Sequence, residues 1–222
     1  MTEPSLTRRG ALGAGLSGLA LLSGCASSPP PTVSTNSPND GPWRTSTDGE
    51  QSRLMLEGHD AVAYFARSEA VRGDPRLSLQ HAGVTWRFAS AAHRSEFQLQ
   101  PQKYLPQFGG FCANGINYAI PWGGGGGPNT WRIYRGKLYV FGGQQSRDNF
   151  EMDTELNLKR AHHYWNEEIA GAQPLIIRFQ RLVFRVPHYQ SDSALKAEWE
   201  ARRAAGTLPV MPGRPQVVPA AA

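Results

Sequence analysis

The stretch that decides the fold is residues 77–88, which read Leu-Ser-Leu-Gln-His-Ala-Gly-Val-Thr-Trp-Arg-Phe. Apolar or ring-bearing residues alternate with polar ones on both sides of Ala82-Gly83, and a two-residue turn of this kind closes a β-hairpin. The same turn is expected to put six side chains on one face of the ribbon, those of Leu77, Leu79, His81, Val84, Trp86 and Phe88. The pattern therefore predicts a hairpin with one face directed toward a core.

A helix is predicted directly after this hairpin. Ser90 is a suitable N-cap, and His93 and Phe97 stand four residues apart, on one side of the expected helix. Pro101 then opens a further helical turn that runs to Tyr104, because proline is well tolerated at the first helical position.

A second hairpin and a longer helix are predicted further along the chain. Residues 131–134 and 137–141 flank Arg135-Gly136, which indicates a turn. Apolar residues recur at helical spacing between Asp153 and Ala170. The sequence therefore predicts one α+β domain over residues 51–172, built of β-hairpins packed on short helices.

The N-terminal segment has the layout of an export signal. Arg8 and Arg9 precede a weakly apolar run, too short to cross a bilayer, that closes with Leu22-Ser23-Gly24-Cys25. Paired arginines are typical of twin-arginine signals, and small residues before a cysteine are typical of a bacterial lipobox. We expect residues 1–24 to be removed and Cys25 to carry a lipid anchor. This predicts an exported, periplasm-facing lipoprotein of the bacterial cell envelope, held to the membrane by its anchor; the alternative is an ordinary cytosolic N-terminal helix.

Composition divides the rest of the chain. Residues 25–50 are rich in Ser, Pro, Thr and Asn, which predicts a flexible tether. Residues 207–222, rich in Pro, Val and Ala, are expected to be disordered.

Between domain and tail, residues 173–206 form a basic extension. Apolar residues recur there at helical spacing with Arg178, Arg181 and Arg185 on the other side, although the β-branched content also allows an extended segment. A second, charged helix is expected from Ser193 to Ala205.

Charge and cysteine content narrow the function classes. The chain has 23 Lys+Arg against 18 Asp+Glu, a formal net charge of +5, and the surplus is dispersed. No Lys/Arg run could neutralise a row of phosphates, so we expect no nucleic-acid partner.

With Cys25 used by the anchor, Cys112 remains alone and no intramolecular disulfide is expected. No hydrolase or zinc-protease motif is present, and we expect no enzymatic activity.

Five short motifs follow one another along the chain. They are Gly-His-Asp-Ala-Val-Ala-Tyr-Phe (58–65), Trp-Arg-Phe-Ala-Ser (86–90), Pro-Gln-Lys-Tyr-Leu-Pro (101–106), Gly-Gly-Phe-Cys-Ala (109–113) and Gly-Lys-Leu-Tyr (136–139). In these motifs and their order the chain resembles the exported YHS-domain proteins. The resemblance covers about residues 54–167. It implies a small YHS-like α+β domain and no single activity.

The resemblance also implies where a thiolate metal site would lie. Metal-binding relatives in the wider YHS group carry three cysteines, which would fall here on Ala63, Ala89 and His93. Alanine offers no lone pair to a metal, so a site of that kind is excluded.

A different ligand or metal site could use His59, Asp60, His93 and Cys112. Imidazole with one thiolate suits copper or zinc. The alternative is that Cys112 is a small buried apolar residue and His93 a half-buried structural histidine.

Two functions remain open. The first is a non-catalytic binding module with a small-ligand or metal pocket lined by residues 58–65 and 109–112. The second is a structural or partner-docking lipoprotein whose working surface, within residues 175–203, faces an envelope protein or anionic lipid. This segment could equally pack on the core and do nothing else.

Overall fold

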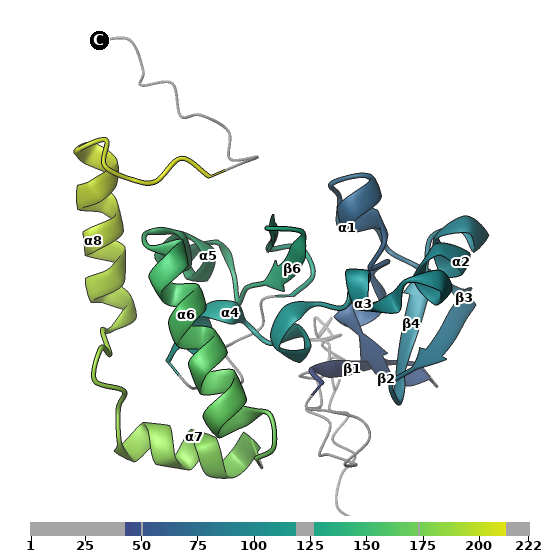
Figure 1. The fold of residues 1–222 in the computed structure, drawn as a ribbon, viewed down its shortest axis with the longest axis horizontal. Coiled ribbons are helices and arrows are strands. Elements are labelled where there is room, and N and C mark those ends of the chain that lie inside the picture. The colour runs from purple at the N-terminus through teal and green to yellow at the C-terminus, as the bar shows by residue number, and fades with distance from the viewer. Residues whose placement is uncertain (1–42, 50, 119–126, 173, 212–222) are drawn as a thin grey trace, which may run out of the picture.

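The computed structural model describes residues 43–49, 51–118, 127–172 and 174–211, and within them it is an α+β fold, as predicted. Figure 1 shows two halves side by side, a sheet-rich half and a helical half. The predicted signal, Cys25 and the glycine-rich residues 122–126 lie outside the described residues.

The sheet-rich half contains a four-stranded sheet in the order β1-β2-β4-β3. Its strands are β1 (Thr45–Asp48), β2 (Gln51–Met55), β3 (Asp74–His81) and β4 (Val84–Phe88). Only the β2–β4 pairing is parallel; the other two are antiparallel. The predicted hairpin is confirmed, because Leu79 pairs with Trp86, and Ala82 and Gly83 take the positive φ angles (52° and 70°) that such a tight turn needs.

Short helices cover this sheet, and two of them follow the predictions. They are η1 (Leu56–Gly58), α1 (Ala63–Ala66), α2 (Ala91–Leu99) and α3 (Pro101–Tyr104). Ser90 caps α2, since its Oγ accepts a hydrogen bond from the His93 N–H at 3.1 Å, and Pro101 begins α3.

We call the apolar interior of this half the sheet-side core. Trp86, which is 1% exposed, packs against Phe97 with ring centroids 4.8 Å apart and against Trp43 at 6.4 Å. Its buried residues are Met55, Leu56, Ala61, Val62, Tyr64, Val84, Trp86, Phe88, Phe97, Tyr104, Leu138 and Val140.

The helical half begins before a second hairpin and continues after it. This hairpin pairs β5 (Trp131–Tyr134) with β6 (Lys137–Val140), which confirms the second predicted turn. The helices of this half are η2 (Gln107–Gly110), α4 (Ala113–Asn117), α5 (Gln144–Glu151), α6 (Thr154–Tyr164), η3 (Trp165–Ile169), α7 (Pro174–Val183) and α8 (Asp192–Ala204). The helix predicted over 153–170 is confirmed as α6 followed by the π-helical η3. The helix α5 was not predicted, because it is mostly polar.

The helix-side core fills this second half, and β6 serves both interiors. Leu138 and Val140 of β6 face the sheet-side core, whereas Tyr139 and the following Phe141 face the helix-side core. The buried residues of the helix-side core are Phe108, Phe111, Cys112, Ala113, Ile116, Tyr139, Phe141, Phe150, Leu158, Ala161, Tyr164, Ile169, Ile177 and Val186.

Two predicted boundaries need correction. Residues 43–49 were expected to belong to the tether, but β1 pairs with β2 there and Trp43 packs against the sheet-side core. Residues 207–211 were expected to be disordered, but Met211 is buried and its sulfur accepts a hydrogen bond from Thr154 Oγ1 at 3.5 Å. In each of the two segments, one large side chain contacts a residue that is distant in the sequence.

Candidate functional site

Asp60 and His93, two of the predicted site residues, form a buried pair. Asp60 is fully buried, and its Oδ1 accepts a hydrogen bond from the Val62 N–H at 2.9 Å. Its Oδ2 accepts one from the Ala89 N–H at 2.8 Å and one from the Nδ1–H of His93 at 2.6 Å. These bonds use the carboxylate fully and fasten the segment before α1 to the start of α2. The pair therefore has a structural task.

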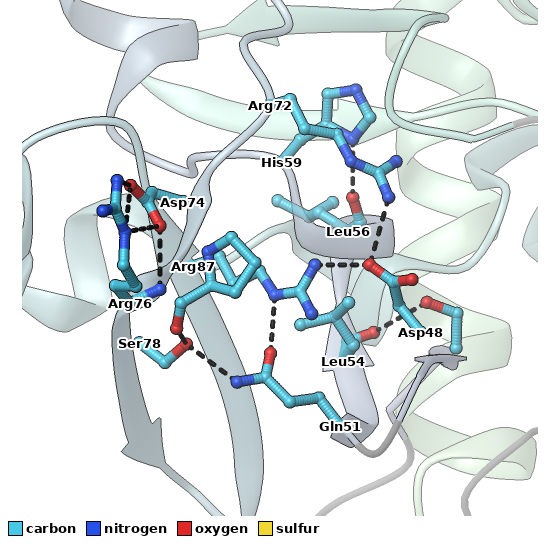
Figure 2. A network of polar contacts seen from close by, with 12 residues as sticks. Asp48, Gln51, Leu54, Leu56, His59, Arg72, Asp74, Arg76, Ser78 and Arg87 are labelled. Atoms are coloured by element: carbon cyan, nitrogen blue, oxygen red, sulfur yellow. Dashed lines mark hydrogen bonds and ion pairs between the residues drawn. The ribbon is translucent and has the colours of Figure 1, made fainter.

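His59 does not join this pair. Its Nδ1 lies 3.1 Å from the carbonyl oxygen of Leu56, to which it donates, and Figure 2 shows the imidazole beside Arg72. Burial lowers the pKa of His59 below its usual value, so the ring is neutral at pH 7.

Cys112 lies in the helix-side core, away from the other three candidates. Its thiol is buried, and Sγ accepts hydrogen bonds from the Gly142 N–H at 3.0 Å and the Gly115 N–H at 3.4 Å. The sulfur thus caps the N-terminus of α4 and joins it to the end of β6. Cys112 is therefore a buried structural residue, which is one of the two alternatives that the sequence allowed.

The four candidates consequently do not form one site. Across the described ranges, no group of three or more His, Cys, Asp or Glu side chains could hold a metal ion. The geometry therefore does not support the copper or zinc site suggested by His59, Asp60, His93 and Cys112.

A polar network that the sequence did not reveal lies on the opposite face of β4 from Trp86 (Figure 2). Arg87 is 3% exposed; its Nε donates to Gln51 Oε1 and its Nη1 to Asp48 Oδ2, both at 2.6 Å. The hydrogen bond and charge of Arg87 hold the pKa of Asp48 below its usual value. A side chain at Gly73 would come within 2.6 Å of Arg87, so that position needs glycine. The network holds β1 on the sheet and offers no open coordination site for a metal ion.

The most unusual surface belongs to α7, at the lower edge of the helical half in Figure 1. Four large apolar side chains of this ten-residue helix are more than half exposed, and Phe184, directly after it, is 69% exposed. The four are Ile176 (54%), Phe179 (70%), Leu182 (57%) and Val183 (57%). We call these five residues the α7 face.

The side of α7 that packs on the body is a different one. Ile177 is 5% exposed and belongs to the helix-side core, and Arg181 pairs with Glu168 of η3 and lies over the ring of Tyr164. Because each residue turns an α-helix by about 100°, Ile177 and Arg181 lie roughly opposite Phe179 and Val183, whereas Phe184 lies on their side and lines a hollow with them. The predicted apolar stripe is real, but along α7 it points to solvent, and its last member, Val186, is buried after the helix ends.

The sequence of α7 and the residues on either side of it is basic. Residues 170–191 contain three arginines and no Asp or Glu. Arg185 lies over the ring of Tyr189, 4.2 Å from its centroid, and forms no ion pair among the described residues. The nearest acidic groups, Glu167 and Glu168 of η3, line an open hollow of about 440 Å3 behind the helix, with Ile177.

None of the helices in the described ranges is long and apolar enough to cross a bilayer. Comparisons with protein-family models, with curated proteins and with solved structures found no match for this chain. Any function therefore has to be argued from the chain's own residues.

Proposed function

We propose that this chain is an exported, lipid-anchored protein of the bacterial cell envelope, with a YHS-like domain, that binds without catalysis and docks on the anionic membrane surface through the α7 face. The observation that carries the proposal is the set of large apolar side chains that α7 directs to solvent while Ile177 and Arg181 hold the helix on the body. The twin-arginine pattern and the lipobox at Cys25 support a location where such a surface meets lipid.

The chemistry of the α7 face favours a membrane surface over water. Full burial of a Leu- or Phe-sized side chain contributes about 1.5–3 kcal/mol, and each arginine near an anionic surface adds about 1 kcal/mol. An apolar face followed by Arg185, which has no ion pair among the described residues, in a stretch of 22 positions without an acidic residue (170–191), matches a helix that lies in the interface plane. An anchor at Cys25 would keep this helix close to lipid and raise its effective concentration there.

Vesicle binding tests the proposal. The expected mature chain from residue 25, with Cys25→Ser to remove the acylation site, is mixed with vesicles of phosphatidylcholine alone or with 30% phosphatidylglycerol, a composition chosen for the test. We expect binding to the anionic vesicles that weakens at high salt. Phe179→Ser with Val183→Ser should weaken it tenfold or more, since two exposed anchors are lost.

A matched control comes from exposed apolar side chains elsewhere. Leu99 and Val210 are 80% and 85% exposed, and Leu99→Ser with Val210→Ser should leave vesicle binding unchanged. Equal binding of all variants, or no binding to anionic vesicles, contradicts membrane docking and leaves the α7 face for an envelope protein partner. Mass spectrometry of the native product tests the anchor separately, because an intact Met1 and an unmodified Cys25 would rule it out.

A further inference from the structure

A polar hollow of about 170 Å3 lies in the helical half, apart from the α7 face. It opens where α6 and α8 meet the segment that joins α7 to α8 (Figure 1). The hydrogen-bonding groups at its wall that matter here belong to Tyr118, Asn149, Arg160, His188 and Gln190.

Arg160 is the central group of this hollow. It is half-buried on α6, and no described residue gives it an ion pair or a hydrogen bond. Arg202, on the opposite wall, differs because it is engaged by Glu198 and by the carbonyl oxygen of Met152. A half-buried arginine that no described residue engages keeps its guanidinium donors available for an anion that enters the hollow.

The neighbours of Arg160 do not supply that anion. Burial and the charges of Arg160 and Arg181 lower the pKa of His188, whose Nε2 donates to the Asn117 carbonyl oxygen at 2.9 Å. The ring is therefore neutral at pH 7. Burial raises the pKa of Tyr118, so its hydroxyl keeps its proton. The wall thus holds Arg160, the Arg202–Glu198 ion pair, the exposed Asp153 and several neutral hydrogen-bonding groups.

We infer that this hollow binds a small monocarboxylate, with Arg160 as the bidentate partner of its carboxylate group. One guanidinium matches one negative charge, and its planar fork fits a carboxylate. A dianion such as phosphate is disfavoured more strongly than a monoanion, because Asp153 and Glu198 also line the hollow. The volume is roughly that of six water molecules, about the size of a three-carbon acid. Neither the α7 face nor the proposed anchor is needed for this site.

Titration of the full chain with sodium lactate, followed by amide chemical shifts, tests the inference. We expect saturable shifts confined to residues around the hollow. Arg160→Gln should weaken lactate binding at least tenfold. Lys159→Gln removes the same charge from the neighbouring, exposed position on α6 and should change the affinity for lactate less than twofold.

A second variant tests the shape of the site without touching its charge. Leu156 lines the hollow and is 39% exposed, so Leu156→Trp can fill the space while the helix remains intact, and it should also abolish lactate binding. Thermal unfolding of each variant checks that the fold persists. Absence of saturable shifts, equal losses in Arg160→Gln and Lys159→Gln, or tighter binding of inorganic phosphate than of lactate would each overturn the inference.

Discussion

The two halves of the molecule differ in how much apolar surface they leave exposed. In the sheet-rich half, Arg87 and Asp60 are buried and hydrogen-bonded, and among the described residues only Leu99 is a strongly exposed large apolar side chain. In the helical half the remaining exposed large apolar side chains gather, and Arg160 stands in a hollow without an acidic partner. The comparison teaches that the first half is a closed scaffold, whereas the second leaves exposed the surfaces for which we propose binding.

The largest effect is expected from a substitution in the closed half. Trp86→Ala removes a side chain that is 1% exposed and should lower the free energy of unfolding by about 3–5 kcal/mol, because a cavity replaces its ring contacts. Trp199→Ala on the outer helix α8, where the tryptophan is half-buried, should cost less than half as much. Urea unfolding of both variants measures the loss in the free energy of unfolding, and equal losses would contradict the difference between the two halves.

An intermediate effect is expected at the buried carboxylate. Asp60→Asn replaces one acceptor oxygen by an amide NH2, which must then face one of the donors from Val62, Ala89 or His93. An unsatisfied buried donor costs about 1–3 kcal/mol, so the free energy of unfolding should fall by about 2 kcal/mol. Glu69→Gln, at an exposed ion pair with Arg67, serves as the control and should show no measurable change in the same unfolding assay.

The smallest effect is a dependence on pH that draws on both halves. Burial lowers the pKa of His59 in the sheet-rich half and of His162 and His188 in the helical half. The unfolded chain takes up protons at these positions near pH 6.5 while the folded chain does not, so stability is present at pH 7 and falls as the pH drops toward 5.

Thermal unfolding at pH 7 and pH 5 measures this dependence. We expect His162→Gln with His188→Gln to flatten it more than His59→Gln does, since two of the three groups are removed. His163→Gln, at an exposed position on α6, should leave the difference between the two pH values unchanged. A protein more stable at pH 5 than at pH 7 would contradict the sign.

Local chemistry was predictable from the sequence, and long-range pairing was not. The Ala82-Gly83 turn and the Ser90 cap are specified by residues next to them, and both are confirmed. The hydrogen bond between Arg87 and Asp48 joins residues 39 positions apart, and the sequence near either residue does not predict it. The same limit explains why the candidate metal ligands do not come together: Cys112 lies in the helix-side core, whereas Asp60 and His93 bond to each other in the sheet-rich half.

The helix α7 shows a second kind of limit. Its periodic pattern correctly predicted an amphipathic helix but could not say which side packs on the body. Ile177 lies off the stripe, yet it enters the helix-side core, as does Val186 after the helix ends. Hydrophobic periodicity describes a helix alone, whereas burial depends on the partner that its neighbours present.

The strand β6 makes the two halves interdependent. Its successive side chains point alternately into one core and the other, so a slip of one residue in its pairing with β5 would exchange the occupants of both interiors at once. Loss of either half leaves one row of these side chains facing water. The folding of the sheet-rich half and that of the helical half are thus coupled through a strand of four residues. The chain cannot be divided at β6 into two independently folding modules.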